Sequence, residues 1–176
     1  MTLKSMNDLN REELLGLLTD ASLNWLAHDG LWFQAVEGKF GTTEAGLCNR
    51  EAIAHYSQIE AKRIMRRFDL VQGGITTLMQ ALKFRMYHLI NDQDFIDVSE
   101  NRCVFRMVGC RVQEARRKKG LPDYPCKPVG IAEYSHFAKT IDPRIQTRCV
   151  ACPPDPHPEG YWCAWEFFID APAPAD

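Results

Sequence analysis

A cysteine-rich stretch near the C-terminus, CVACPPDPHPEGYWCAWEFF (Cys149–Phe168), holds the residue types best suited to chemistry. Cys149 and Cys152 form a C-x-x-C pair, and Cys163 follows beyond a proline-rich loop. Cys126 lies in a second proline-bounded segment, YPCKP. Because C-x-x-C supplies the usual chelating pair of a tetrahedral Zn²⁺ site, these four cysteines could together bind zinc.

Two other interpretations of the same cysteines stay open. Cysteine is among the most buried residue types, so the thiols could simply pack in a core. A redox pair is the third option, although C-x-x-C normally acts at a helix N-terminus, whereas this pair follows a predicted strand and precedes Pro-Pro. His157 in the loop could replace one cysteine as a metal ligand. Closing a hairpin across Pro153–Gly160 is expected to bring Cys149 beside Cys163.

Cys110 lies where a predicted strand meets a predicted helix. Backbone N–H groups and the helix dipole at a helix N-terminus lower the pKa of a thiol, and Arg111 adds positive charge. The sequence therefore offers Cys110 as a nucleophile. The alternative is a buried structural cysteine at the end of a strand.

Charged residues also fall on or beside apolar helical stripes of the N-terminal half. At 100° per residue, Glu60 and Arg63 fall beside Tyr56, and Asp29 falls beside Trp25. Charges on a core-facing stripe must be paired or line a cavity. We therefore expect either an ion pair between Glu60 and Arg63 or a pocket floor that carries an acid or base.

The elements that would position these residues begin with helices. A capping box at Asn10 and Glu13 predicts the start of a first helix, and Gly38 predicts its end. Gly30 could kink or split this helix. Two further helices are predicted over about residues 43–68 and 75–89. The stripe expected to face the core in the first of these two consists of Ala45, Cys48, Ala52, Tyr56 and Ile59.

The hydrophobic period then changes from helical to alternating. Residues 94–108 are β-branched and aromatic around a short polar turn, which predicts a β-hairpin. Helices are predicted over 111–120 and 130–141, and two more strands over 145–151 and 161–169. The fold class is therefore α+β, in which a helical N-terminal half precedes two β-hairpins that form an antiparallel sheet with intervening helices.

Composition limits the classes of protein. With 176 residues, 45% hydrophobic and 25% charged, we expect one domain over residues 1–169 and a frayed Pro/Ala-rich tail at 170–176. The net charge of −2 lacks the basic footprint of a nucleic-acid binder. Residues 1–16 lack the apolar core of a secretory signal, and no apolar run suits a membrane span. We expect a cytoplasmic protein with reduced thiols and no nucleic-acid or membrane partner.

The stretch from Cys110 to Phe167 resembles an uncharacterised family of small prokaryotic cytosolic proteins, which is similar to the L-2-amino-thiazoline-4-carboxylic acid hydrolase-like family. The resemblance rests on Cys110, Cys126 and the segment GYWCAWEF, in which Cys163 is the shared cysteine. The segments WLAHDGLWF and GTTEAGLCNREA add weaker support upstream. The resemblance implies an α+β domain with a helical N-terminal half and hydrolysis of a cyclic amidine-like ring.

We therefore expect a hydrolase-like protein that acts on a small carbon–nitrogen substrate. The expected site residues are Cys110 as nucleophile, Glu60 or Asp29 as acid or base, Arg63 or Arg116 as carboxylate anchor, and Cys126, Cys149, Cys152 and Cys163 as zinc ligands. A closed four-cysteine site leaves no open position, so this zinc would act structurally unless one thiolate is displaced. The alternative is a non-enzymatic zinc-binding or small-ligand sensor. A small molecule is the expected partner, and the sequence leaves a homo-oligomer open.

Overall fold

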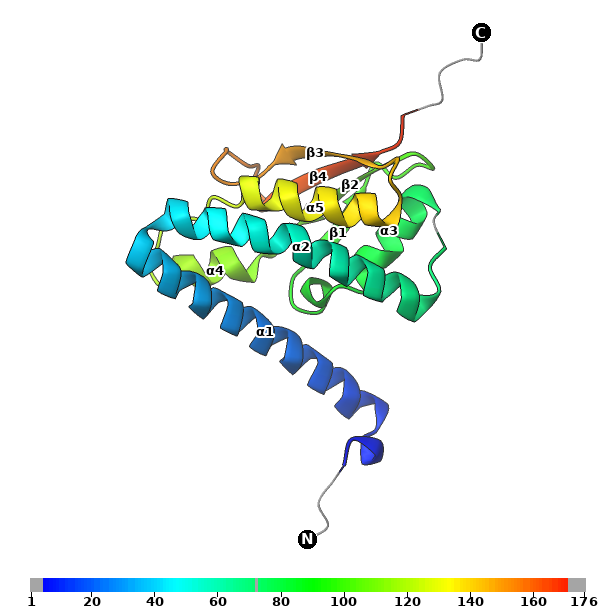
Figure 1. The fold of residues 1–176 in the computed structure, drawn as a ribbon, viewed down its shortest axis with the longest axis horizontal. Helices are drawn as coiled ribbons and strands as arrows, with labels where there is room; N and C mark the ends of the chain where they lie inside the picture. The colour runs from blue at the N-terminus through cyan, green and yellow to red at the C-terminus, as the bar shows by residue number, and fades with distance from the viewer. Residues whose placement is uncertain (1–4, 72, 171–176) are drawn as a thin grey trace.

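The structure, a computed structural model, describes residues 5–71 and 73–170 (Figure 1). Helices make up the N-terminal half. They are the 3-10 helix η1 (Met6–Asp8), α1 (Arg11–Phe40), α2 (Thr42–Phe68), α3 (Gly74–Lys83) and the 3-10 helix η2 (Met86–Leu89). The C-terminal half contains β1 (Gln93–Ile96), β2 (Arg102–Met107), α4 (Arg111–Lys118), α5 (Lys127–Ile141), β3 (Gln146–Ala151) and β4 (Cys163–Phe168).

The four strands form one antiparallel sheet in the order β1-β2-β4-β3. Each outer pair is a hairpin, and the hairpins join where β2 pairs with β4. The predicted α+β class with two hairpins and intervening helices is therefore confirmed. The predicted hairpin turn lies between β1 and β2, and Cys110 lies between β2 and α4 as expected.

The predicted start of α1 is correct, whereas its predicted end is not. The side chain of Asn10 accepts a hydrogen bond from the Glu13 N–H, and the Glu13 carboxylate accepts one from the Asn10 N–H, both at 2.9 Å. These two bonds satisfy N–H groups that have no partner inside the helix. The helix continues through Gly30 and Gly38 and ends at Phe40, and its C-cap is Gly41, whose φ of 87° favours glycine.

The helices and the sheet are arranged in layers (Figure 1). One face of the sheet packs on α5, α2 packs against α5, and α1 contacts α2 in its C-terminal half and diverges from it toward its N-terminus (Figure 1). Trp165 and Phe167 of β4 meet Tyr134 of α5 with ring centroids 4.9 and 6.2 Å apart. Gly130 allows this close approach, because a Cβ at that position would lie 2.4 Å from the Trp165 ring.

The predicted core stripe of α2 is wrong in part. Cys48, Ala52 and Ile59 are exposed, and the buried residues of the helix are Ala45, Ile53, Ser57, Glu60, Ala61 and Ile64. The buried face therefore includes polar side chains that find local partners. Ser57, for example, donates a hydrogen bond to the Ile53 carbonyl at 2.7 Å. Buried polar groups satisfied in this way do not show in an apolar pattern.

The N-terminal half of α1 extends beyond the other elements (Figure 1). Four of its leucines, Leu14, Leu15, Leu17 and Leu18, are 43–48% exposed. At the opposite end of the chain, the expected frayed tail lies outside the described residues apart from Asp170. Among the helices of residues 5–71 and 73–170, none combines the length and apolar character that crossing a membrane requires.

Candidate functional site

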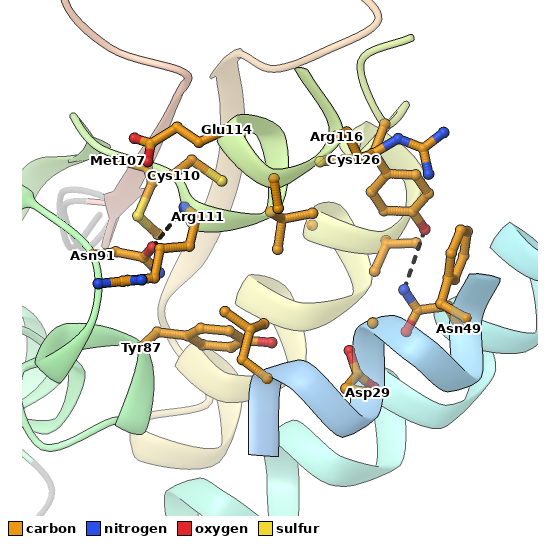
Figure 2. A pocket seen from close by; sticks show the side chains of 18 of the residues that line it. Asp29, Asn49, Tyr87, Asn91, Met107, Cys110, Arg111, Glu114, Arg116 and Cys126 are labelled. Carbon is orange, nitrogen blue, oxygen red and sulfur yellow. Dashed lines mark hydrogen bonds between the residues drawn. The ribbon is translucent and has the colours of Figure 1, made fainter. Parts of the chain in front are cut away.

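A cavity of about 600 Å³ opens between α1, η2, α4 and the first turns of α5. Its lining is mainly apolar and includes Leu26, Phe33, Ile53, Val112, Val129 and Trp165. The predicted site residues Asp29, Cys110, Arg116, Cys126, Cys152 and Cys163 also line it. The cavity therefore brings together residues from both halves of the chain, as Figure 2 shows for those that it labels.

Three of the four cysteines predicted as zinc ligands, Cys126, Cys152 and Cys163, line the cavity, and Cys149 lies beside them. Cys152 is fully buried, and its side chain forms hydrogen bonds with the thiols of Cys126 and Cys163. Cys149 forms a further hydrogen bond with Cys152. We call these four residues the thiol cluster. Its members come from the N-cap of α5, from β3, from the residue after β3 and from the start of β4.

The route by which these thiols meet differs from the expected one. The register pairs Cys149 with Trp165, and it pairs Cys163 with Met107 of β2. The two cysteines are therefore not direct neighbours across the hairpin. An irregularity between Cys149 and Ala151 shifts the register, and the two thiols are instead connected through Cys152.

Two N–H donors point at sulfur atoms of the thiol cluster. The Gln113 side chain, which is 1% exposed, donates to Cys126 Sγ at 3.0 Å, and Trp165 Nε1 donates to Cys163 Sγ at 3.3 Å. Gln113 also bonds the backbone N–H and C=O of Tyr124, each at 2.9 Å, which fixes the segment before α5. The sequence analysis missed Gln113, because a glutamine in a charged helix gives no sign of burial.

Proton affinities differ across the thiol cluster. The hydrogen bond with Cys152 lowers the pKa of the Cys163 thiol, whereas hydrogen bonding to its neighbours raises the pKa of Cys152. Burial raises the pKa of Cys149. Within residues 5–71 and 73–170, no three or more His, Cys, Asp or Glu side chains are arranged to hold a metal ion. Zinc binding at these cysteines therefore stays a prediction.

Cys110 is the N-cap residue of α4 and lines the cavity, but its environment differs from the expected one. Burial raises the pKa of its thiol to about 12, and this effect outweighs the lowering by backbone N–H groups of Gln113 and Val112. Arg111 is exposed, and its Nε donates to the Ile90 carbonyl at 2.8 Å. The expected lowering of the Cys110 pKa is therefore wrong, because desolvation dominates the helix N-terminus.

The predicted ion pair between Glu60 and Arg63 is also wrong. Glu60 is buried and accepts a hydrogen bond from Arg85 Nε at 2.7 Å, whereas Arg63 is exposed and lies outside the cavity. Arg85 also pairs with Glu133 of α5 at 2.7 Å. A buried guanidinium from the start of η2 thus joins α2 to α5, which spacing within one helix could not reveal.

The cavity contains two carboxyl groups whose pKa is raised by desolvation, Asp29 of α1 and Glu133 of α5. Figure 2 shows Asp29 and Tyr87 directed into the cavity from different elements. Glu133 was not predicted, although its spacing offers a signal. It falls between Val129 and Phe137 at intervals of four residues, and both of those neighbours are buried.

Arg116 reaches the cavity wall, but its guanidinium is already bound. It pairs with both carboxylate oxygens of Glu37 at 3.0 and 3.1 Å and donates to the Pro122 carbonyl at 2.8 Å. The Arg116 hydrogen bonds lower the pKa of Glu37. Figure 2 shows the guanidinium pointing away from the cavity. Arg116 therefore connects α4 to α1, and its expected role of binding a substrate carboxylate stays a prediction.

A protein-family model matches residues 7–169, which is most of the chain. The chain belongs to this family, described as a family of unknown function (DUF6125). No protein with curated annotation and no solved structure matches. The DUF6125 match runs from η1 to the end of β4, so it includes both the cavity and the thiol cluster. It carries no link to the L-2-amino-thiazoline-4-carboxylic acid hydrolase-like family.

Proposed function

We propose that this protein binds a small, largely apolar molecule in the cavity between α1, α4 and α5. The observation that carries the proposal is the cavity itself, with its volume of about 600 Å³ and its mainly apolar lining. Sites for small molecules are typically about 300–1,000 Å³ with apolar walls and a few polar groups. This combination favours the small-ligand alternative from the sequence over the hydrolase.

The polar groups of the cavity indicate which ligand would fit. Asp29 supplies carboxyl oxygens, whereas Glu133 is paired with Arg85 and the nearby Arg116 is paired with Glu37. A ligand with an N–H or amino group facing Asp29 would offset the desolvation of that carboxyl. We therefore propose a heteroaromatic or aliphatic amine rather than a carboxylate as the ligand class.

Blocking the cavity tests this proposal. Ala27 and Ala35 are both exposed on α1, but only Ala27 lines the cavity. A panel of heteroaromatic amines, with tryptamine and indole-3-acetate as a pair of opposite charge, would be screened by calorimetry. We expect Ala27→Trp to weaken binding of the amines at least about tenfold and Ala35→Trp to leave it unchanged. Absence of binding across the panel, or equal binding by both variants, contradicts the proposal.

Hydrolysis of a small carbon–nitrogen compound is the second candidate function. Cys110 and Asp29 line the same cavity, so a thiol and a carboxyl group would face a bound substrate, while Glu133 in the same lining is paired with Arg85. Glu60 and Arg63 take no part in this version, because neither lines the cavity. Turnover of L-2-amino-thiazoline-4-carboxylate that disappears in a folded Cys110→Ala variant supports it, and binding without turnover rejects it.

The remaining expectations are compatible with either function. Zinc held by the four cysteines would support the inner wall of the cavity, since a closed site of this kind is structural. A cytoplasmic location and a homo-oligomer stay predictions from the sequence.

A further inference from the structure

Beyond ligand binding, we propose that the outward face of α1 pairs with the same face of a second copy of this chain, as two antiparallel helices. The proposal starts from a row of exposed residues that runs along most of the helix. We call this row the outer stripe, and it consists of Leu14, Leu17, Ala21, Asn24, His28, Leu31 and Ala35.

The first argument is the spacing of the outer stripe. From Leu14 to Ala35 its members follow one another at alternating steps of three and four residues. An interval that averages 3.5 residues is the repeat of helices that pack side by side along a seam. Every member of the stripe is exposed in the single chain, and Leu31 is 64% exposed. The stripe therefore has the pattern of a helix–helix seam and the exposure of a free surface.

The second argument is that α1 is apolar on two faces. Its inner face has partners within the chain, since Trp25 stacks on Tyr56 with ring centroids 5.5 Å apart and Phe33 meets Tyr124 at 4.8 Å. At 100° per residue, the outer stripe is centred about 150° from Phe33. Trp32, which lies beside the stripe, is 65% exposed. Contiguous apolar surface of this kind marks an interaction site.

The third argument is that the stripe is complementary to itself in one orientation. When two copies run antiparallel with Leu26 of both at the same level, Leu17 faces Ala35 and Ala21 faces Leu31. Each of these layers then combines a large side chain with a small one, as close packing requires. A parallel pair would set each residue against its own copy, which leaves gaps where alanine meets alanine. The side-chain sizes therefore favour the antiparallel pair.

The polar members of the stripe support the same register. In the antiparallel pair Asn24 of one copy faces His28 of the other on both sides of the two-fold axis. A side-chain amide and an imidazole can hydrogen-bond to each other. A single polar layer within an apolar seam fixes the register and the number of helices, at some cost in affinity. The polar residues thus select one alignment of the two copies.

The size of the seam fits a reversible dimer. The stripe is about 32 Å long at 1.5 Å per residue, on a helix about 10–12 Å across with its side chains. Counting both copies and their interdigitated side chains, the pair buries on the order of 1,000 Å². Specific interfaces begin at about this size, and those below about 1,200 Å² are often transient. We therefore expect a dimer with a dissociation constant on the order of 10 μM.

Charge on α1 favours a second copy over a membrane surface as the occupant. Helices that lie on membranes carry lysine and arginine beside their apolar face. In α1 acidic residues outnumber basic ones, and Asp20 flanks the outer stripe. A second copy brings the same apolar stripe and requires no basic flank.

Sedimentation velocity on the full chain tests the pairing. Between about 1 and 200 μM protein, the weight-average mass should rise from 20.1 kDa toward twice that value. The mass of a single chain at every concentration overturns the proposal. So does a monomer that binds vesicles of anionic phospholipid, because that result assigns the face to a membrane.

Matched variants locate the seam. Leu17 and Leu15 are 43% and 47% exposed in the same segment of α1, and only Leu17 belongs to the outer stripe. We expect Leu17→Glu to raise the dimer dissociation constant at least about tenfold and Leu15→Glu to change it less than about threefold. Both variants should be as helical as wild type by circular dichroism, because glutamate is a good helix former. Equal effects of the two variants on the dissociation constant would contradict the assignment.

A second substitution tests the orientation. Adding Ala35→Lys to Leu17→Glu places opposite charges in the same layers of an antiparallel pair, so the double variant should regain at least about threefold of the lost affinity. In a parallel pair the introduced charges would meet their own kind, and a double variant weaker than either single one overturns the antiparallel arrangement. Leu17 lies outside the cavity lining, so Leu17→Glu should bind amines as wild type does. Failure of the pairing and failure of the proposed function are therefore distinguishable.

Discussion

Arg85 connects two carboxylates that come from different helices. Its guanidinium pairs with Glu60 of α2 and Glu133 of α5, each at 2.7 Å, and it lies 4.8 Å from the centroid of the Phe137 ring. Glu60 and Arg85 are both more than nine-tenths buried. A buried charge network of this kind holds elements in register, but it makes each member costly to remove alone.

Arg85→Met should therefore be strongly destabilising. It leaves Glu60 and Glu133 without their cation, and the loss in unfolding free energy should be about 3–5 kcal/mol by urea denaturation. Adding Glu60→Gln and Glu133→Gln should recover part of this loss. Arg63→Met, at an exposed position of α2, is the control and should stay within about 0.5 kcal/mol of wild type. An Arg85→Met variant whose free energy of unfolding stays close to that of wild type would show that the network contributes little to stability.

Asp29 should make stability depend on pH in an unusual direction. Desolvation raises its pKa above the ordinary 3.8, so the folded state holds this proton more tightly than the unfolded chain. The resulting cost in unfolding free energy is absent below pH 3.8, grows as the pH rises from 3.8 to the folded pKa, and is constant above the folded pKa. Asp29→Asn should therefore be more stable than wild type at pH 7 and similar at acidic pH.

Urea denaturation at pH 3.5 and pH 7 measures this effect. Asp20→Asn, at an exposed position of the same helix, is the matched control. Equal stability of Asp29→Asn and wild type at pH 7 would show that the carboxylate is well solvated. A less stable variant at pH 7 would show that the carboxylate makes favourable contacts in its ionised form.

At the scale of elements, the cavity depends on how closely α5 approaches β4. A Cβ on Gly130 would lie 2.4 and 2.8 Å from atoms of the Trp165 ring, which is itself buried. Gly130 lies one turn after Cys126, and its N–H donates to the Cys126 carbonyl at 2.8 Å. The same close approach therefore places Cys126 beside Cys152 and Cys163.

Gly130→Ala should destabilise the protein by about 1–3 kcal/mol, because the added methyl group must push α5 away from β4. Gly46→Ala in α2 is the matched control, since nothing lies within 4 Å of its added Cβ. That change should be neutral or stabilising by up to about 1 kcal/mol. Thermal and urea unfolding compare the two variants. Equal effects would mean that the contact at Gly130 relaxes without strain.

Local patterns of the chain account for the element types and for few of the contacts. The capping box at Asn10 and the change of period at about residue 94 are local signals, and both give correct elements. The partners of Glu60 and Arg116 lie 25 and 79 residues away in sequence, so spacing along one helix could not identify them. The cysteines of the cluster were predictable by type and their register was not, because a single irregularity in β3 shifts the pairing.

At the scale of the whole molecule, α1 is supported unevenly. Its C-terminal half borders the cavity and is tied to α4 by the Glu37–Arg116 pair. Its N-terminal half extends beyond the body with four half-exposed leucines (Figure 1). Helical segments shorter than about 12–15 residues are marginal in water without tertiary contacts.

Hydrogen exchange followed by mass spectrometry should therefore divide α1. In dilute protein, amides of residues 14–21 should exchange at least about 100-fold faster than those of α5, because local opening of a segment with few buried contacts costs little free energy. Amides in the second half of α1 should exchange at rates between these two. Repeating the measurement at protein concentrations from about 1 to 100 μM separates a segment that is stable alone from one that a second copy of the chain protects. Slow exchange at every concentration would show that this segment is stable alone, contrary to the prediction. Protection that grows with concentration would mean that a second copy of the chain covers the leucines, which would supply the homo-oligomer that the sequence left open.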